Sequence, residues 1–348
     1  MLSVRRLVAN FTWVGAASGL LACGGGAKEG TAEQSKGAAA GAKTFRIAMI
    51  AKSSTNPVFL AARTGAENAA KELSATHGVA VTIDWLTPPT ENSEMQAQRI
   101  AQAVNDGANA ILVSSSDASK VTGAIDAAVE RGVPVMMFDS DAPNSKRFSF
   151  YGGDDVALGR MLMSELATQM GGKGKIAILG GNQVAVNLQG RIRGVKEEAT
   201  KYRGITIVNT FYHSETPQDA AAEVIRAQNA YPEIQGWAMI GGWALFTRAL
   251  LTDLKPERVK IVSVDGLPAE LPYLESGLAP VLLAQPVYLW GDISVRTIFD
   301  KVYLKKEVPA LVEMKMVRVT KENLGTWARQ LQAWGFTDVD PKYLALKN

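Results

Sequence analysis

Cysteine and histidine are scarce in this chain of 348 residues, which contains one cysteine and two histidines. A single cysteine excludes an internal disulfide bond. The two histidines, His77 and His213, do not suggest a zinc site or a catalytic cluster. We therefore expect no bound metal.

An excess of charge of one sign is also lacking. The chain has 37 lysines and arginines against 34 aspartates and glutamates, and the basic residues are scattered along it. This pattern excludes the basic patch that nucleic-acid binding requires, so small ligands or protein partners remain. Beyond the N-terminal segment, no run reaches the roughly 18–20 apolar residues of a transmembrane helix.

The N-terminal segment is the part that carries the cysteine. Arg5 and Arg6 precede a mostly apolar stretch that ends in LLAC at 20–23, a pattern typical of a signal peptide. The segment resembles a bacterial lipoprotein signal, which implies that residues 1–22 are cleaved and that Cys23 is lipidated. An ordinary buried cysteine near a cleaved signal is the alternative. Residues 23–43 lack aromatic residues and periodicity, and we expect a flexible tether that holds the protein at a membrane in the periplasm or cell envelope.

What the chain has in abundance is apolar sequence, 47% of all residues, which predicts a large core and about two domains. From residue 45 onward, short apolar runs alternate with amphipathic stretches, a pattern typical of an α/β fold with parallel sheets. The predicted strands are 45–51, 79–85, 110–114, 133–138, 175–179, 205–211, 237–240, 259–264, 281–284 and 312–319. The predicted helices are 57–74, 93–106, 119–131, 156–170, 188–202, 218–231, 243–254, 288–302 and 324–334.

The two halves repeat one arrangement. The fourth strand of each half ends at an aspartate, Asp139 in the first and Asp265 in the second. Ligands of open α/β sheets bind beside the carboxyl ends of the strands, so two such lobes would face each other across a cleft. Each aspartate taken alone is equally compatible with a helix cap.

The sequence contains only weak matches to nucleotide-binding and catalytic motifs. Residues 172–177 spell GxGxxA but precede their strand, so their amides would not face a phosphate at a helix N-terminus. Gly241 and Gly242 follow a strand, yet no phosphate-binding lysine and no nucleophile elbow accompany them. We expect neither a cofactor nor an enzyme.

Residues suited to sugar recognition do follow the strands. Carboxylates, amides and cations bond hydroxyl groups, and aromatic rings cover the apolar faces of a sugar. Each of these residues taken singly also has a structural interpretation, such as a core ring or a surface ion pair. The predicted ligand-binding residues are Lys52, Asn56, Phe59, Asp139, Asp141, Arg191, Trp243, Asp265 and Gln285.

Several of these positions lie in stretches that together resemble a known family. The stretches are AKSSTNPVF at 51–59, GANAILVS at 107–114, GVPVMMFD at 132–139, RIRG at 191–194, DG at 265–266 and LAQ at 283–285. Residues 45–319 look like the periplasmic sugar-binding proteins of ABC importers, in the cluster that includes ribose-binding proteins.

The resemblance implies a type I periplasmic binding protein: two similar Rossmann-like lobes with parallel sheets, joined by a three-strand hinge. The N-terminal lobe would comprise 44–148 and 286–312, and the C-terminal lobe 149–285 and 313–348. By resemblance, Asn56, Phe59 and Asp139 fall on ligand contacts of the first lobe, Arg191 and Asp265 on those of the second, and Gln285 on the hinge side.

The chain also departs from the ribose binders. Ser140 stands where they carry arginine, and Gly241-Gly242-Trp243 stands where they carry Asn-Asp, while Lys52 is closer to the rhamnose and autoinducer-binding branches. We therefore expect a monomeric, lipid-anchored protein that delivers a monosaccharide or related polyol to an ABC permease. The alternative is a sensory co-receptor that presents a sugar or autoinducer-like ligand to a membrane chemoreceptor or kinase.

Overall fold

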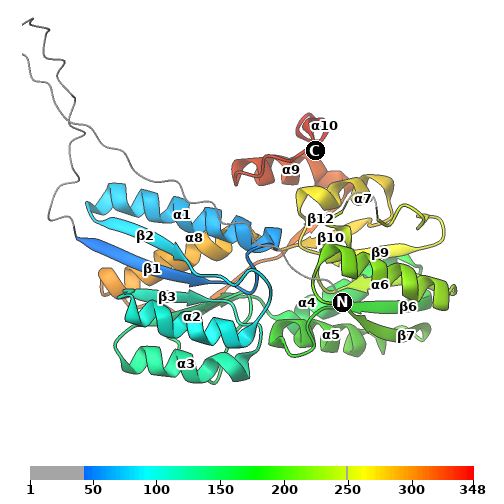
Figure 1. Cartoon of the computed structure of the whole chain (residues 1–348). Coiled ribbons are helices and arrows are strands. Elements are labelled where there is room, and N and C mark those ends of the chain that lie inside the picture. The colour runs from blue at the N-terminus through cyan, green and yellow to red at the C-terminus, as the bar shows by residue number, and fades with distance from the viewer. Residues whose placement is uncertain (1–42, 248–249) are drawn as a thin grey trace, which may run out of the picture. The chain divides into compact units, whose positions relative to one another are not determined.

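The computed structural model describes residues 43–247 and 250–348, and all of these residues belong to one compact unit. The predicted signal, tether and lipidated Cys23 therefore lie outside the described residues, except for Lys43. Two six-stranded sheets organise the unit, each covered by helices, as predicted (Figure 1). No helix in the described part of the chain has the length and apolarity needed to cross a bilayer.

The first sheet has the order β11-β5-β4-β3-β1-β2, and every neighbouring pair is parallel. Its strands are β1 (Thr44–Ile50), β2 (Ala80–Trp85), β3 (Ala110–Val113), β4 (Val135–Phe138), β5 (Ser149–Gly152) and β11 (Leu311–Glu313). The helices of this lobe are α1 (Pro57–His77), α2 (Ser93–Asn105), α3 (Ala118–Glu130) and α8 (Val287–Ile298), which continues as the π-helix η3 (Phe299–Tyr303).

Alternation along β1 shows how this sheet is buried on both faces. Ile47 and Met49 pack in one apolar cluster together with residues of α1 and α8. Ala48 and Ile50 pack in another with residues of α2 and α3. Successive strand residues point to opposite faces, so a strand with helices on both sides is apolar throughout.

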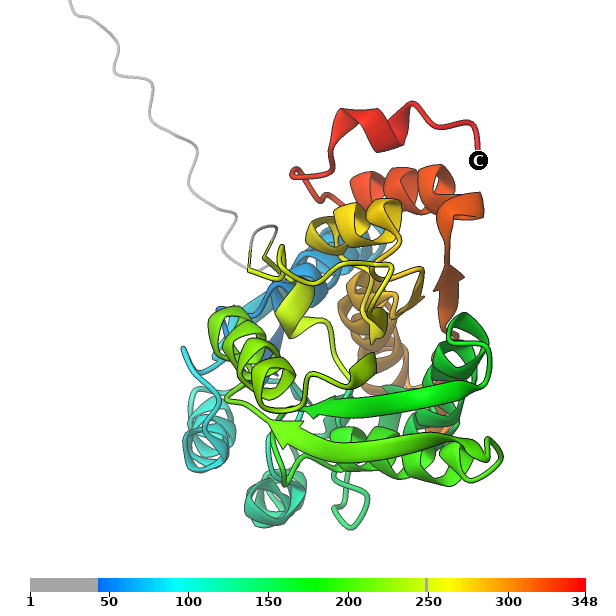
Figure 2. The ribbon, with the colours of Figure 1, turned by 90° about the vertical axis from the view of Figure 1, so that its right-hand side faces the viewer.

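The second sheet has the order β12-β10-β9-β8-β6-β7, and only the β10–β12 pair is antiparallel. Its strands are β6 (Lys173–Gly180), β7 (Gly204–Tyr212), β8 (Ile234–Met239), β9 (Lys260–Val264), β10 (Val281–Ala284) and β12 (Val317–Val319). The helices of this lobe are α4 (Asp155–Gln169), α5 (Val186–Ala199), α6 (Pro217–Ala230), α7 (Leu271–Ser276), α9 (Leu324–Ala333) and α10 (Pro341–Leu344). Figure 2 views the unit from this side, with β6 and β7 in front.

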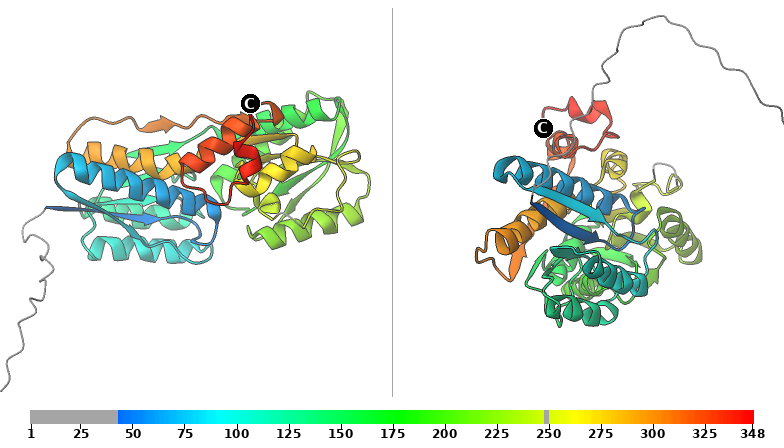
Figure 3. Two further views of the ribbon diagram at one scale, coloured as in Figure 1. Left: turned by 90° about the horizontal axis from the view of Figure 1, so that it is seen from above. Right: turned by 60° about the vertical axis from the view of Figure 1, so that its left-hand side comes forward.

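The chain passes between the sheets after β5, after β10 and between β11 and β12. The segment after α9 also joins the lobes, because Trp334 stacks on Tyr288 of α8 with ring centroids 5.8 Å apart. Figure 3 shows this C-terminal part, in red, running across the unit.

Three sequence predictions need correction. The single strand predicted at 312–319 is two strands in different sheets, because the chain crosses between lobes at 314–316. The predicted boundary after residue 148 separates β5 from its sheet, although β5 pairs with β4. In the described part of the helix predicted at 243–254, the helical structure is limited to a 3-10 turn, η1 (Trp243–Leu245). All three residues of η1 are buried. A surface helix needs a polar face toward water, and these three residues provide none.

Close packing of α4 on α5 fixes the helix that carries Arg191. A Cβ atom at Gly159 would lie 2.0 Å from the backbone oxygen of Arg191, and one at Gly194 would lie 2.1 Å from that of Val156. Glycine lets the two helix backbones approach, and a larger residue at either position would push them apart.

Gly159→Ala is therefore expected to destabilise the protein by about 1–3 kcal/mol, because the added methyl group meets backbone rather than a flexible side chain. Gly123→Ala in α3 is the matched control, since a Cβ there meets nothing within 4 Å. It should stabilise the helix by about 0.5–1 kcal/mol. Urea unfolding measures both; equal stabilities for the two variants would contradict this account of the α4–α5 contact.

Candidate functional site

A cavity lies between the two lobes, beside the carboxyl ends of their strands. Every predicted ligand-binding residue except Asp141 lines it. The lining residues are Lys52, Asn56, Val58, Phe59, Asp139, Asn187, Leu188, Arg191, Glu215, Gly241, Trp243, Asp265, Gln285 and Trp290.

Asp139 stands at the centre of the first-lobe wall. It follows β4 in a left-handed conformation with φ of 57°, which turns its carboxylate out of the strand direction. The hydroxyl of Ser114 donates to Oδ2 at 2.7 Å, and the Lys52 ammonium lies 3.9 Å from the same oxygen. The carboxylate is thus held in place and presented to the cavity.

Lys52 supplies the cation of this wall and is buried. Burial alone would lower the pKa of Lys52, but the carboxyl groups of Asp139, Glu215 and Glu91 outweigh burial and raise it above its usual value. The ammonium therefore stays charged. Its Nζ also donates to Oδ1 of Asn187 at 3.3 Å, which joins the first lobe to α5 of the second.

Arg191 organises the second-lobe wall by donating in three directions. Its guanidinium donates to Asp155 at 2.9 Å, to the backbone oxygen of Ile240 at 3.0 Å and to Oε1 of Gln285 at 2.9 Å. Burial opposes the charge, yet the nearby carboxylates hold the pKa of Arg191 above its usual value. Burial raises the pKa of Asp155 to about 6, although the positive charge of Arg191 acts to lower it.

Asp265 is the acidic residue of this wall. Gln285 Nε2 donates to Oδ1 at 2.6 Å, and the Gly242 amide donates to Oδ2 at 2.8 Å. Burial raises the pKa of Asp265, while Arg191 and these donors oppose the rise. Its φ of 90° is, like that of Asp139, in the positive region that non-glycine residues rarely adopt. Backbone strain of this kind concentrates at functional sites.

Aromatic rings complete the lining. Phe59, Trp243 and Trp290 all border the cavity. Phe59 also belongs to the apolar cluster of the first lobe, where its ring centroid lies 6.3 Å from Phe138 and 6.0 Å from Trp290. Phe59 is therefore a core residue of the first lobe that also borders the cavity.

Asn56 has a similar double position. Its side-chain oxygen caps α1 by accepting the amide of Val58 at 3.1 Å, and Pro57 begins the helix. The cap fixes the start of α1 at the cavity wall, and Asn56 and Val58 both line the cavity.

Asp141, which was also predicted as a ligand contact, does not line the cavity. Its carboxylate is held by the guanidinium of Arg147, at 2.5 Å from Nε and 2.7 Å from Nη2. In a regular strand, Asp139 and Asp141 would point to the same face of the sheet. The left-handed conformation of Asp139 ends the strand geometry, so the two side chains point in different directions.

Asn187, Glu215 and Trp290 are cavity residues that the sequence analysis missed. Asn187 lies one helical turn before Arg191 on α5, and this spacing places both residues on one face of the helix. The spacing would have predicted Asn187 beside Arg191 in the site. Glu215 comes soon after β7, whose carboxyl end lies at the same sheet edge. Trp290 comes from α8, and only the fold brings it here.

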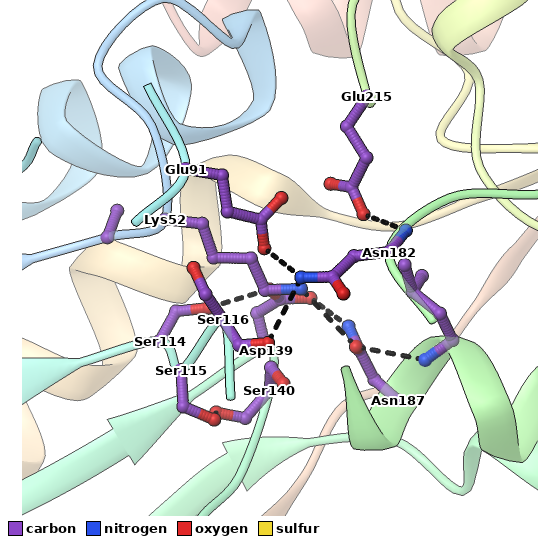
Figure 4. Close-up of polar contacts among 12 residues, drawn as sticks. Lys52, Glu91, Ser114, Ser115, Ser116, Asp139, Ser140, Asn182, Asn187 and Glu215 are labelled. Atoms are coloured by element: carbon purple, nitrogen blue, oxygen red, sulfur yellow. Dashed lines mark hydrogen bonds and ion pairs between the residues drawn. The ribbon is translucent and has the colours of Figure 1, made fainter. Parts of the chain in front are cut away.

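Polar side chains join the lobes across the cavity (Figure 4). Asn187 accepts from Lys52 and donates through Nδ2 to Oδ1 of Asp139 at 3.1 Å. The free space left in the cavity is about 20 Å³. By the same measure a single water molecule needs roughly 10–15 Å³. A guest the size of a sugar does not fit the cavity in this closed arrangement.

The site combines donors and acceptors from both lobes with paired charges. Lys52 faces Asp139, and Arg191 faces Asp155 and, through Gln285, Asp265. Such a lining suits a neutral molecule with many hydroxyl groups, which donate and accept in turn. Within residues 43–247 and 250–348, no three acidic, histidine or cysteine side chains are grouped to hold a metal ion.

Comparison with known proteins finds one matching family. Residues 47–306 match the periplasmic binding protein domain. The ribose import binding protein RbsB of Bacillus subtilis is 28% identical over 139 residues, 40% of this chain and 43% of the relative, so the chain spans under half of that relative. The xylitol-binding protein of Mycolicibacterium smegmatis is 25% identical over 259 residues, 73% of each chain.

A solved structure resembles the chain along most of its length. It is an ABC transporter solute-binding protein from Burkholderia graminis in complex with D-arabinose. Its TM-score is 0.76 at 24% sequence identity, and the alignment covers 81% of this chain and 97% of that one. At this identity the likeness concerns the fold.

Proposed function

The chain belongs to the family of periplasmic binding protein domains, and from that membership we propose that it captures a monosaccharide or related polyol between its lobes and delivers it to an ABC permease. It is a periplasmic sugar-binding protein rather than an enzyme, in keeping with the family and with relatives named for ribose and xylitol. The resemblance of residues 51–59 and 132–139 to this family agrees with the match.

The observation that carries the proposal is the pairing of Asp139 and Asp265 across one cavity. The two aspartates come from opposite lobes, and each is fixed by surrounding donors in a rare backbone conformation. Each carboxylate offers a charged acceptor to a sugar hydroxyl, a bond worth about 1.5–3 kcal/mol. Trp243, Trp290 and Phe59 offer apolar faces to the ring.

Capture in this proposal is a closure of the two lobes. A sugar bound to one lobe gains the contacts of the other only when the lobes close, so binding shifts the population toward the closed form. The three chain crossings near residues 153, 285 and 315 are the hinge. The N-terminal lobe then comprises the first sheet with its helices, and the C-terminal lobe the second.

A thermal-shift screen tests the proposal. Pentoses, hexoses, deoxysugars and polyols are each added to the purified protein, and at least one should raise its melting temperature. A ligand at a hundred times its dissociation constant stabilises the folded form by about 2.7 kcal/mol. Saturating amounts of the whole panel without any shift would contradict sugar capture.

By the same proposal, Cys23 anchors the protein to a membrane in the periplasm or cell envelope, and the protein acts as a monomer beside its permease. Cys23 lies outside the described residues. Membrane fractionation of a Cys23→Ser variant, which should release the protein, is the check.

A further inference from the structure

Two carboxyl groups meet at the gap between the lobes, next to the sugar cavity. Glu91 belongs to the loop after β2 in the first lobe, and Glu215 to the loop after β7 in the second. A crevice lined by both residues adjoins the cavity, and Glu215 lines the two spaces.

Asn182 holds the two carboxyl groups together. Its backbone amide donates to Oε1 of Glu215 at 2.8 Å, and its side-chain Nδ2 donates to Oε1 of Glu91 at 2.9 Å. The same Nδ2 also donates to the backbone oxygen of Ser116 at 3.2 Å. Figure 4 shows Asn182 between the two glutamates. Because Asn182 and Glu215 are in the second lobe and Glu91 and Ser116 in the first, the contacts to Glu91 and Ser116 form only when the lobes close.

Glu215 cannot turn away easily. Its φ of 58° places it in the left-handed region, and its backbone amide donates to Nδ1 of His213 at 3.0 Å. Its side chain packs beside Gly181, where an added Cβ would lie 2.7 Å from Oε1. The carboxyl group is thus fixed toward the first lobe.

The charges around this pair are unbalanced. Lys52 is the cation that faces both glutamates, and it is shared with Asp139, while Arg191 is paired with Asp155. Burial lowers the pKa of His213 to about 4, so its ring is neutral above that pH. Three carboxyl groups therefore surround one lysine. Glu91 and Glu215 are half-buried, and two neighbouring carboxylates of like charge repel each other until one of them takes up a proton.

We propose that Glu91, Asn182 and Glu215 form a latch across the gap that takes up one proton as the lobes close. These residues are positioning residues for capture, because they set how readily the two walls of the cavity come together. The proposal concerns closure itself and does not depend on which sugar is bound.

The direction of the pH dependence follows from the closed state. Burial raises the pKa of Glu215 to about 8 from an ordinary value of 4.5; Lys52 opposes this rise, and the negative charge of Glu91 adds to it. A carboxyl whose pKa is higher in the closed form favours closure most below its open-form pKa. The advantage is lost as the pH rises toward the closed-form pKa. The ratio of closed to open protein should fall with rising pH between about 4.5 and 8, by at most about tenfold per pH unit.

Distances between spin labels on the two lobes measure this ratio directly. Labels are attached at Ala127→Cys in α3 and Lys196→Cys in α5, both exposed, in a Cys23→Ser background. The closed fraction of this parent should decrease from pH 5 to pH 8 and change little above pH 9. Glu215→Gln, which keeps the shape of the neutral acid, should stay as closed at pH 9 as the parent is at pH 5.

Two further variants sharpen the test. Glu91→Gln should weaken the pH dependence, because it removes the contribution of Glu91 but leaves Glu215 buried. Glu257→Gln, an exposed glutamate of the second lobe, should leave the pH dependence unchanged. A closed fraction in the parent that does not vary between pH 5 and 9 would overturn the proposal. So would an equal decrease in Glu215→Gln. No sugar is added in this experiment. Its outcome is therefore independent of the thermal-shift screen that tests sugar capture.

Discussion

Replacement of Arg191 by methionine is expected to weaken sugar binding at least about a hundredfold and to lower the free energy of unfolding by about 3–5 kcal/mol. Methionine keeps much of the apolar stem but leaves Asp155 without its ion pair and Gln285 and Ile240 without their donor. Gln285 in turn holds Asp265. One substitution therefore loosens the second-lobe wall of the cavity.

The same helix provides the control. Arg193→Met removes a side chain that is 62% exposed and lies 3.9 Å from Glu197, so its effect on stability and affinity should be small. Arg191→Lys keeps the charge but not the planar fork, and we expect an intermediate loss. Urea unfolding and calorimetry measure both quantities. Wild-type affinity in Arg191→Met would remove Arg191 from the site.

The second large effect is expected at Asp139. Asp139→Asn keeps the shape of the side chain but removes the charge that faces Lys52 and accepts from Ser114 and Asn187. The loss of a charged acceptor should reduce sugar affinity about ten- to a hundredfold. Lys52 also loses its nearest counter-charge, so its pKa should fall.

Asp141→Asn is the matched control for Asp139→Asn. Asp141 lies in the same loop, but its carboxylate bonds Arg147 outside the cavity. Calorimetric titration should show unchanged sugar affinity in Asp141→Asn and a clear loss in Asp139→Asn. Equal affinities for the two variants would mean that Asp139 does not contact the sugar.

The fold was predictable because the relevant signals are local. Strands buried on both faces are continuous apolar runs, and helices with caps such as Asn56-Pro57 begin where the sequence indicates. The strand-end rule then predicts Asp139 and Asp265 at one site, since both follow strands whose carboxyl ends border the cavity.

The residues that were missed depend on contacts between lobes. Asn182 bonds Glu91 and Ser116 of the other lobe, and these contacts form only where loops distant in sequence meet. Trp290 reaches the cavity from α8, which returns to the first lobe after the chain has completed most of the second. The spacing of residues along the sequence does not indicate which loops and helices will meet across the two lobes.

The claim on which the account depends is that a sugar binds between Asp139 and Asp265. A crystal structure of the protein, grown with the sugar that stabilises it most in the thermal-shift screen, tests this most directly. The account predicts sugar hydroxyl groups within hydrogen-bond distance of both carboxylates and a ring packed against the aromatic lining. A sugar that contacts one lobe only, or that lies outside this cavity, would contradict it.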